Sequence, residues 1–213
     1  MHVTSGKVPV FLPIVHPDEK AAIERTILEG ALKSTKAQGI PLYDLSHPPI
    51  QNEENHFDFT LLTGGGEEFL DLVEVVLPGG YSGAPASYGV GDFADHMFGL
   101  VKKKSKKYGT RRRSNIHLLL YSTDWKFLPS ESVITLFSLY CYRRPHGFKT
   151  VAVTAPIMAG AAVLWRAFPP FPSADAIVGA DEQYLRGRVL HQMDPQAAEA
   201  TPDGLGVGWK VPG

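Results

Sequence analysis

The sequence predicts an α/β (α+β) fold in which helices flank a central mixed sheet. Helix and strand patterns alternate along most of the chain, and a hairpin of two apolar arms lies among them at residues 56–77. Strand–helix–strand units follow the hairpin, and such units bring helices to both faces of a sheet. With 213 residues, 44% of them hydrophobic, the chain is long enough for one well-packed domain.

The first helix is expected from Pro17 to about Ala37. Proline suits the first helical turn, the acids that follow it suit the helix dipole, and Gly39 is a typical stop. Glu24 lies three residues before Ile27 of the apolar stripe, so it points at the same face. Its carboxylate either reaches water from the edge of that stripe or belongs to a site.

Short strands are expected at residues 8–12 and 42–47, ahead of the hairpin. The hairpin arms, HFDFTLL and EEFLDLVEVVL, are rich in aromatic and β-branched residues, and the glycines between them permit a tight turn. Asp58 and Glu74 each have Phe, Leu or Val on both sides. A buried carboxylate costs about 2–5 kcal/mol unless a metal ion, a basic side chain or a shifted pKa compensates it.

Two registers of the hairpin are compatible with the sequence. If Leu62 pairs with Glu67, Asp58 lies opposite Asp71 and the two acids form a surface pair. A shift of one residue at the glycines places Asp58 beside Glu74 instead. Only the second register gathers Asp58 and Glu74 into a site.

The second half of the chain is expected to hold a loop and then alternating helices and strands, at residues 79–91, 92–108, 115–121, 131–142, 149–154 and 157–168. Asp92 and Ser130 are the expected N-caps, and Gly109 is the expected end of the first of these helices. Residues 1–155 are predicted to form the core domain. Residues 156–213 are predicted to be a C-terminal extension, partly helical with an extended or disordered tail.

The segment 102–113 is basic, with eight Lys or Arg residues and no acid. At about 100° per residue, Lys104 lies in the apolar stripe of its helix and points at the sheet, whereas Lys102 and Lys106 point away. The segment is either a solvated helix face and loop or a surface for a nucleic-acid backbone. The candidate nucleic-acid contacts are Lys103, Lys106, Lys107, Arg111, Arg112 and Arg113.

Composition excludes several other classes of function. The single cysteine, Cys141, allows neither an internal disulfide nor a cysteine-based zinc site. The histidines form no metal-binding pair, and no GxSxG sequence marks a serine hydrolase. No secretory signal is visible, and the longest apolar run, residues 155–164, is too short to span a membrane. The expectation is a cytoplasmic protein without a membrane partner.

The element order and the placement of the acids resemble the PD-(D/E)XK, or restriction-endonuclease-like, nuclease superfamily. That family has an Asp at the start of the second strand, an acid-x-Lys sequence in the third, and often a Glu on the first helix. The resemblance implies a restriction-endonuclease-like core in which Asp58, Glu74 and Glu24 occupy these positions. The motif lysine is replaced by Val76, and Lys104 on the following helix is a candidate for a migrated lysine.

The resemblance further implies a metal-dependent nuclease that hydrolyses phosphodiester bonds, with Mg²⁺ or Mn²⁺ as cofactor. Asp58, Glu74 and the carbonyl of Val75 would hold the metal ion. Lys104 would orient the attacking water or stabilise the transition state, and Glu24 would support a second metal ion or a ligating water.

Two alternatives stay open. The first is the same fold without catalysis, as a module that binds nucleic acid or a protein partner, since Val76 stands at the lysine position. The second is a small-molecule enzyme on another α/β sheet, with residues 79–91 as a lid over a deep apolar pocket. A homodimer is compatible with each of these.

Overall fold

The computed structural model describes residues 16–37, 39, 41–53, 57–76, 87–123, 127–158, 161–170, 175–191, 199–200 and 207–208. At its centre is a six-stranded sheet in the order β1-β2-β3-β5-β6-β7. The strands are β1 (Ile50–Gln51), β2 (Phe59–Thr63), β3 (Gly66–Glu74), β5 (Ile116–Tyr121), β6 (Thr150–Met158) and β7 (Ala161–Phe168). β3, β5 and β6 are parallel and the other neighbours antiparallel, so the sheet is mixed, as predicted.

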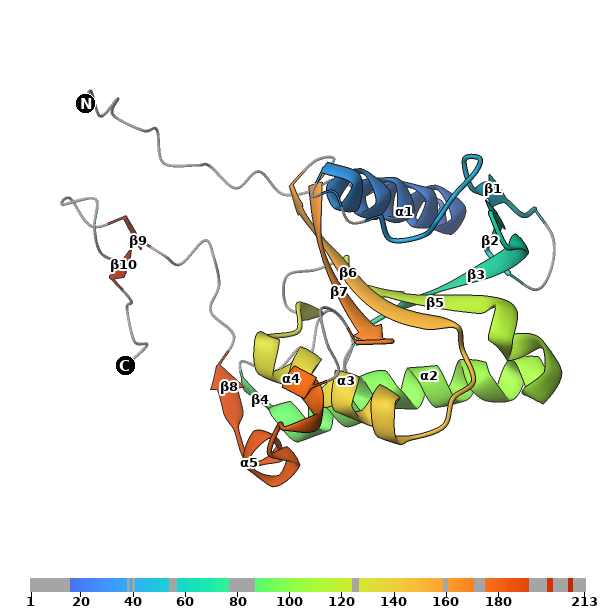
Figure 1. Ribbon diagram of the computed structural model, residues 1–213. Coiled ribbons are helices and arrows are strands. Elements are labelled where there is room, and N and C mark those ends of the chain that lie inside the picture. Colours follow the sequence, from blue (N-terminus) through green and yellow to red (C-terminus); the bar gives the residue numbers. More distant parts are fainter. Residues whose placement is uncertain are drawn as a thin grey trace.

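Helices cover both faces of this sheet. Figure 1 shows α1 (Lys20–Ala37) on one face and α2 (Val90–Arg112) on the other, where α3 (Glu131–Arg143) packs beside it. Two hydrophobic cores result, one between α1 and the sheet and one between the sheet and the α2–α3 pair. Leu28 and Leu70 belong to the first core, and Phe93 and Leu118 to the second.

Several predicted features are confirmed where local chemistry decides them. The hairpin β2–β3 forms at residues 59–74, and Gly66 at its turn adopts a positive φ of 111°. The backbone N–H of Val133 donates to the Ser130 side chain, which caps α3 as expected. Gly39 follows the end of α1 with a φ of 71°.

Other predicted elements are wrong. The segment 42–47 forms only an isolated bridge between Leu45 and Thr63. Helix α2 does not end at Gly109 but continues to Arg112, and a short 3-10 turn, η1 (Arg113–Asn115), follows it. The strand expected at residues 8–12 lies outside the described residues.

The expected helix at residues 157–168 is instead strand β7, which pairs with β6. A short apolar run fits a buried strand or a helix equally well, and here pairing with a neighbouring strand decides. The predicted domain boundary at residue 155 therefore falls inside β6. The central sheet continues to Phe168.

The described part of the chain beyond β7 contains two short helices, whereas the helix predicted for the C-terminal extension was placed at residues 157–168. β4 (Ser87–Gly89) pairs with β8 (Val189–His191), next to α4 (Asp175–Val178) and α5 (Glu182–Arg186). Arg186 of α5 lies 2.7 Å from a carboxylate oxygen of Asp95 on α2, which ties α5 to the core. β9 (Glu199–Ala200) and β10 (Val207–Gly208) form a separate pair. Among the described helices, every one is too short or too polar to cross a lipid bilayer.

Candidate active site

The register of the hairpin decides which acids meet. Leu62 pairs with Glu67 and Phe59 with Leu70, so Asp58, which directly precedes β2, lies opposite Asp71. The backbone N–H of Leu72 donates to Oδ2 of Asp58 at 2.6 Å, which holds this carboxyl group against β3. The structure therefore adopts the first of the two registers.

Asp71 is the most buried acid of this region, with 1% of its surface exposed. The ammonium nitrogen of Lys104 lies 2.9 Å from its Oδ1 and 2.7 Å from its Oδ2. The hydroxyl of Tyr108 donates to Oδ2 at 2.6 Å. The expectation of a surface pair in this register is thus wrong, because helix α2 covers the face of the hairpin on which Asp71 lies.

In addition to burial, Asp71 raises the pKa of Asp58 through a side-chain hydrogen bond and through its charge, and such a hydrogen bond requires a proton on one of the two carboxyl groups. Burial raises the pKa of Asp58 to about 7, and the hydrogen bond with Asp71 adds to the rise, against the opposing bond from Leu72. The Asp58 proton relieves repulsion between the two acids. A metal ion that took its place would do the same.

Helix α1 brings a third acid towards this pair. Glu24 is 4% exposed, and its Oε1 lies 3.2 Å from Nζ of Lys20. Burial raises the pKa of Glu24, while Lys20 and Lys104 lower it and Asp71 raises it further. Glu24 therefore lies within electrostatic reach of Asp71 and Lys104, on the inward face of its helix as predicted.

Glu74 and Val75 are not brought to Asp58. Side chains alternate along a strand, so Glu74, three residues from Asp71, points to the opposite face of the sheet. Its Oε1 accepts a hydrogen bond of 2.6 Å from Thr123. Val75 donates its backbone N–H to the carbonyl of Tyr121, and its side chain is buried in the core. Asp58, Glu74 and Val75 therefore do not form the expected metal site. That site required a hairpin register shifted by one residue from the observed one, in which Leu62 pairs with Glu67.

Asp58, Asp71, Lys104 and Tyr108 form the acidic cluster. Asp71 and Tyr108 were not predicted from the sequence as site residues. Asp71 lies two residues from Phe69 and from Val73, which pack in the core under α2. Because side chains two residues apart on a strand lie on the same face, Asp71 also faces α2. Tyr108 lies four residues after Lys104 and so shares its face of the helix. The period-2 signal for Asp71 was present, but using it required the correct hairpin register.

The donor set suits a small divalent cation. Asp58 and Asp71 offer adjacent carboxylate oxygens, and Mg²⁺ commonly takes one or two carboxylates and keeps several waters. Among the described residues, no group of three or more His, Cys, Asp or Glu side chains is arranged to hold a metal ion. Asp58 and Asp71 would supply only part of the shell of such a cation, and Lys104 and Tyr108 already contact Asp71.

The basic segment begins beside the acidic cluster. The side chains of Lys102, Lys103, Lys106 and Lys107 are exposed on α2. Nζ of Lys107 lies 5.0 Å from the ring centroid of Tyr108, whereas Nζ of Lys102 lies 5.4 Å from the ring of Phe98. The side chains of Arg111, Arg112 and Arg113 lie outside the described part of the structure.

A second buried polar cluster lies on the α1 side of the sheet. Nε2 of His117 lies 2.5 Å from Oε2 of Glu68, and its Nδ1 lies 2.8 Å from Oγ1 of Thr150. Lys149 donates to the other oxygen of Glu68. Each charged group here has a partner, which is typical of a structural network.

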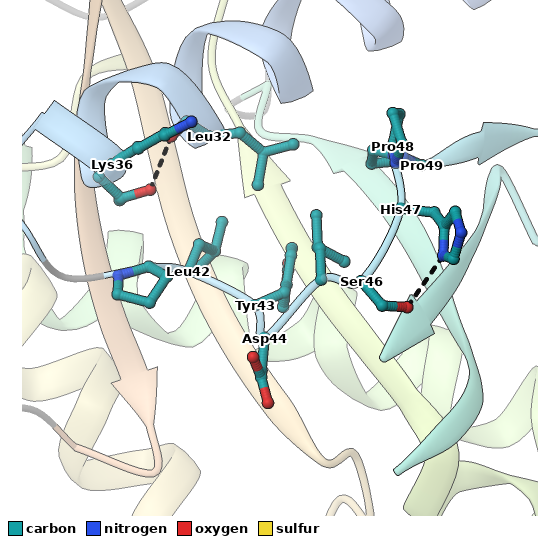
Figure 2. Close-up of a pocket in the computed structure, with 12 residues that line it drawn as sticks. Leu32, Lys36, Leu42, Tyr43, Asp44, Ser46, His47, Pro48 and Pro49 are labelled. Atoms are coloured by element: carbon teal, nitrogen blue, oxygen red, sulfur yellow. Dashed lines mark hydrogen bonds between the residues drawn. The ribbon is translucent and has the colours of Figure 1, made fainter. Parts of the chain in front are cut away.

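One pocket of about 570 Å³ lies next to that network. Figure 2 shows Leu32 and Lys36 of α1 on one side of it, and Tyr43, Ser46 and His47 of the facing segment on the other. The Tyr43 ring contacts the ring of His117 with a centroid distance of 4.7 Å. The residues that line the pocket come from α1 and from the segment 41–49, on the α1 side of the sheet, whereas Asp71 faces α2. Residues 79–86 of the expected lid lie outside the described residues.

Comparison of the chain with protein-family models, with curated proteins and with solved structures finds no match.

Proposed function

We propose that the protein is a metal-dependent nuclease with a restriction-endonuclease-like core, acting in the cytoplasm. One observation carries the proposal, the cluster in which Asp58, Asp71 and Lys104 meet. Two adjacent carboxyl groups, with a lysine directed at one of them, are a set of side chains that could catalyse phosphodiester hydrolysis. The carboxylates would hold a cation, and the lysine would supply a fixed positive charge.

The order of elements supports the same proposal. A helix, three strands, a helix, a strand, a helix and a strand follow one another from α1 to β6, apart from the short β4 and η1. Asp58 stands at the start of the second strand, as in the family pattern. Asp71 in the third strand replaces Glu74 as the second acid. The motif lysine would then fall at Val73, and Lys104 of α2 supplies the amine from the following helix.

In the proposed mechanism Asp58 and Asp71 would hold Mg²⁺ or Mn²⁺. The bound ion would lower the pKa of a coordinated water and offset charge on the phosphate oxygens. Lys104 would turn from Asp71 to the attacking water or to the phosphate, and the 24% exposure of its side chain leaves the ammonium group accessible to both. Glu24, whose pKa is raised by burial and affected by the charges of Lys104 and Asp71, would accept a hydrogen bond from a water bound between these two groups.

The exposed lysines of α2 would bind the backbone of the substrate. Lys103 and Lys107 flank Lys104 on the helix, and the segment continues to Arg111, Arg112 and Arg113. Contacts of this kind add affinity that depends on salt and not on base sequence. The proposed partner is therefore a nucleic acid bound without base readout.

Calorimetry with Mg²⁺ and Mn²⁺ tests the metal site. The wild type should bind, Asp58→Ala and Asp71→Ala should lose binding, and Glu74→Ala should keep it. Glu74 is a matched control because it lies on the same strand as Asp71 but on the opposite face. A wild type that binds no metal at millimolar concentration, with nucleic acid present, overturns the proposal.

Cleavage assays test the chemistry. Plasmid DNA and single-stranded RNA are incubated with Mg²⁺ or Mn²⁺ and either the wild type or Lys104→Ala. We expect the variant to lose cleavage while it keeps metal binding, because the lysine is not a ligand. Equal cleavage by the two proteins would assign the activity to other residues.

A module without catalysis is the second candidate, and one observation favours it. The ammonium group of Lys104 already neutralises Asp71, so the cluster is balanced without a metal ion. Such a module would bind nucleic acid equally well in EDTA and in Mg²⁺. It would release no cleavage product in either buffer.

A further inference from the structure

Tyr108 contacts the candidate metal-binding acid directly. Its hydroxyl lies 2.6 Å from Oδ2 of Asp71, the same oxygen that lies 2.7 Å from Nζ of Lys104. Hydrogen bonds to a carboxylate restrict its rotation and leave the remaining lone pairs in defined directions. Lys104 also lies 2.9 Å from Oδ1, so Tyr108 is the donor that would remain on this carboxylate if the lysine moved away.

The ring of Tyr108 is held in place by other aromatic rings. It stacks on Phe57 at a centroid distance of 5.0 Å, and Phe57 stacks on Phe69 at 4.5 Å. Phe57 directly precedes Asp58, and Phe69 lies two residues before Asp71. The same stack thus connects α2 to the two strands that carry the acids.

Tyr108 and Lys104 have different parts in the proposed mechanism. Lys104 is the group that would leave Asp71. The Tyr108 ring is held by its stack on Phe57, so its hydroxyl stays directed at Oδ2 of Asp71.

We propose that Tyr108 is a positioning residue that holds Asp71 in the orientation needed for a divalent cation when Lys104 moves to the substrate. The proposal rests on the proposed metal site. Groups that hydrogen-bond to metal-ligating carboxylates typically contribute about 10–100-fold to metal affinity. The contribution of Tyr108 comes from its hydroxyl and not from its ring.

The test compares Tyr108→Phe with the wild type by calorimetry with Mn²⁺. Phenylalanine keeps the ring and its stack on Phe57, so the variant is expected to fold. We expect its Mn²⁺ affinity to fall by about tenfold or more, with little change in Tm. Tyr142→Phe is the control, since Tyr142 is 47% exposed on α3 and should bind Mn²⁺ like the wild type.

The outcomes distinguish the positioning role of Tyr108 from the proposed metal site on which it rests. If the wild type binds Mn²⁺ and Tyr108→Phe binds it equally well, the positioning role is overturned and the metal site stands. If Tyr108→Phe lowers Tm but leaves the affinity unchanged, Tyr108 is merely structural, and the role is again overturned. If the wild type binds no Mn²⁺, both proposals fall.

Discussion

The ammonium nitrogen of Lys104 lies 2.7 Å from one carboxylate oxygen of Asp71 and 2.9 Å from the other, across a sequence separation of 33 residues. The Asp71 side chain is 2% exposed, and that of Lys104 is 24% exposed. Without this partner, the buried carboxylate would carry a large desolvation cost. The pair therefore stabilises the packing of α2 on β3 and places the ammonium group of Lys104 at the candidate site.

Replacement of Lys104 by Met should destabilise the protein by about 2–3 kcal/mol, because it leaves the Asp71 charge buried with less compensation. The double variant Lys104→Met/Asp71→Asn removes both charges and should recover most of that loss. Denaturant unfolding of the four proteins in this cycle gives the coupling energy, expected at about 2 kcal/mol.

Lys102→Met is the matched control for this cycle. Lys102 is exposed on the same helix, and its replacement should change stability by no more than about 0.5 kcal/mol. A coupling energy near zero between Lys104 and Asp71 would contradict the interpretation. It would mean that Tyr108 and solvent suffice to stabilise the carboxylate.

Asp58→Asn should stabilise the metal-free protein above pH 7. The pKa of Asp58 is raised from 3.8 to about 7, so between these values the folded state holds a proton that the unfolded state releases. Stability from this group is therefore complete at low pH and is lost as pH rises through about 7. Asparagine needs no proton, can still accept from Leu72, and can donate to Asp71.

The expected gain of Asp58→Asn at pH 8 is about 1 kcal/mol after solvent screening, or about 2–4 °C in Tm for a chain of this size. The gain should shrink towards zero at pH 4. Thermal unfolding in EDTA at several pH values measures it. A gain that is the same at pH 4 and pH 8 would show that the proton shared with Asp71 is not its source.

The buried pair of His117 and Glu68 predicts the opposite pH dependence. Burial lowers the pKa of His117, although Glu68 works against it, so the ring gives up its proton more readily in the folded protein than in the unfolded chain. Burial alone would raise the pKa of Glu68, but hydrogen bonds from Lys149 and His117 outweigh it and lower that pKa. Both groups thus bind protons more readily when the chain unfolds, and stability falls on acidification.

The loss due to His117 should begin near pH 6.5, the ordinary pKa of histidine, and the loss due to Glu68 should follow below about pH 4.5. His117→Gln removes the first step, so its stability should change less between pH 7 and pH 5 than that of the wild type. His47→Gln, at an exposed position, is the control. Parallel pH profiles for wild type and His117→Gln would contradict the assignment.

Local sequence signals predicted some features correctly, although Asp92 and Gly109 mark neither end of α2 (Val90–Arg112). Helical periodicity placed Lys104 on the inward face of α2, and Ser130 marked the start of α3. The identity of β7 depended on pairing with β6, which its own residues do not encode. A helix was therefore predicted there in place of a strand.

The candidate site was only half predictable for a related reason. Asp58, Glu24 and Lys104 were identified from their position within single elements. The second acid, Asp71 or Glu74, depended on a shift of one residue in the hairpin, and such a shift moves every side chain to the other face. The register depends on the turn at Gly66 and on packing under α2. Both depend on contacts that form only when the chain folds.

Nucleic-acid binding should depend on one side of α2 more than on the other. Relative to Lys104, the helix places Lys107 at about 60° and Lys103 at about 100°, whereas Lys102 and Lys106 lie at about 160°. Lys107 also lies against the ring of Tyr108, next to Asp71. A nucleic-acid backbone that reaches the acids must therefore pass Lys103 and Lys107.

The measurement is binding of labelled DNA or RNA in EDTA over a range of salt concentrations. Lys103→Ala/Lys107→Ala should weaken binding and reduce the slope of log K against log salt by about 2, since each lost phosphate contact removes about one unit. Lys102→Ala/Lys106→Ala removes the same charge from the far side of the helix and should leave the slope nearly unchanged. Equal effects of the two pairs would show that the basic segment attracts nucleic acid only through its total charge, without directing it to the acidic cluster.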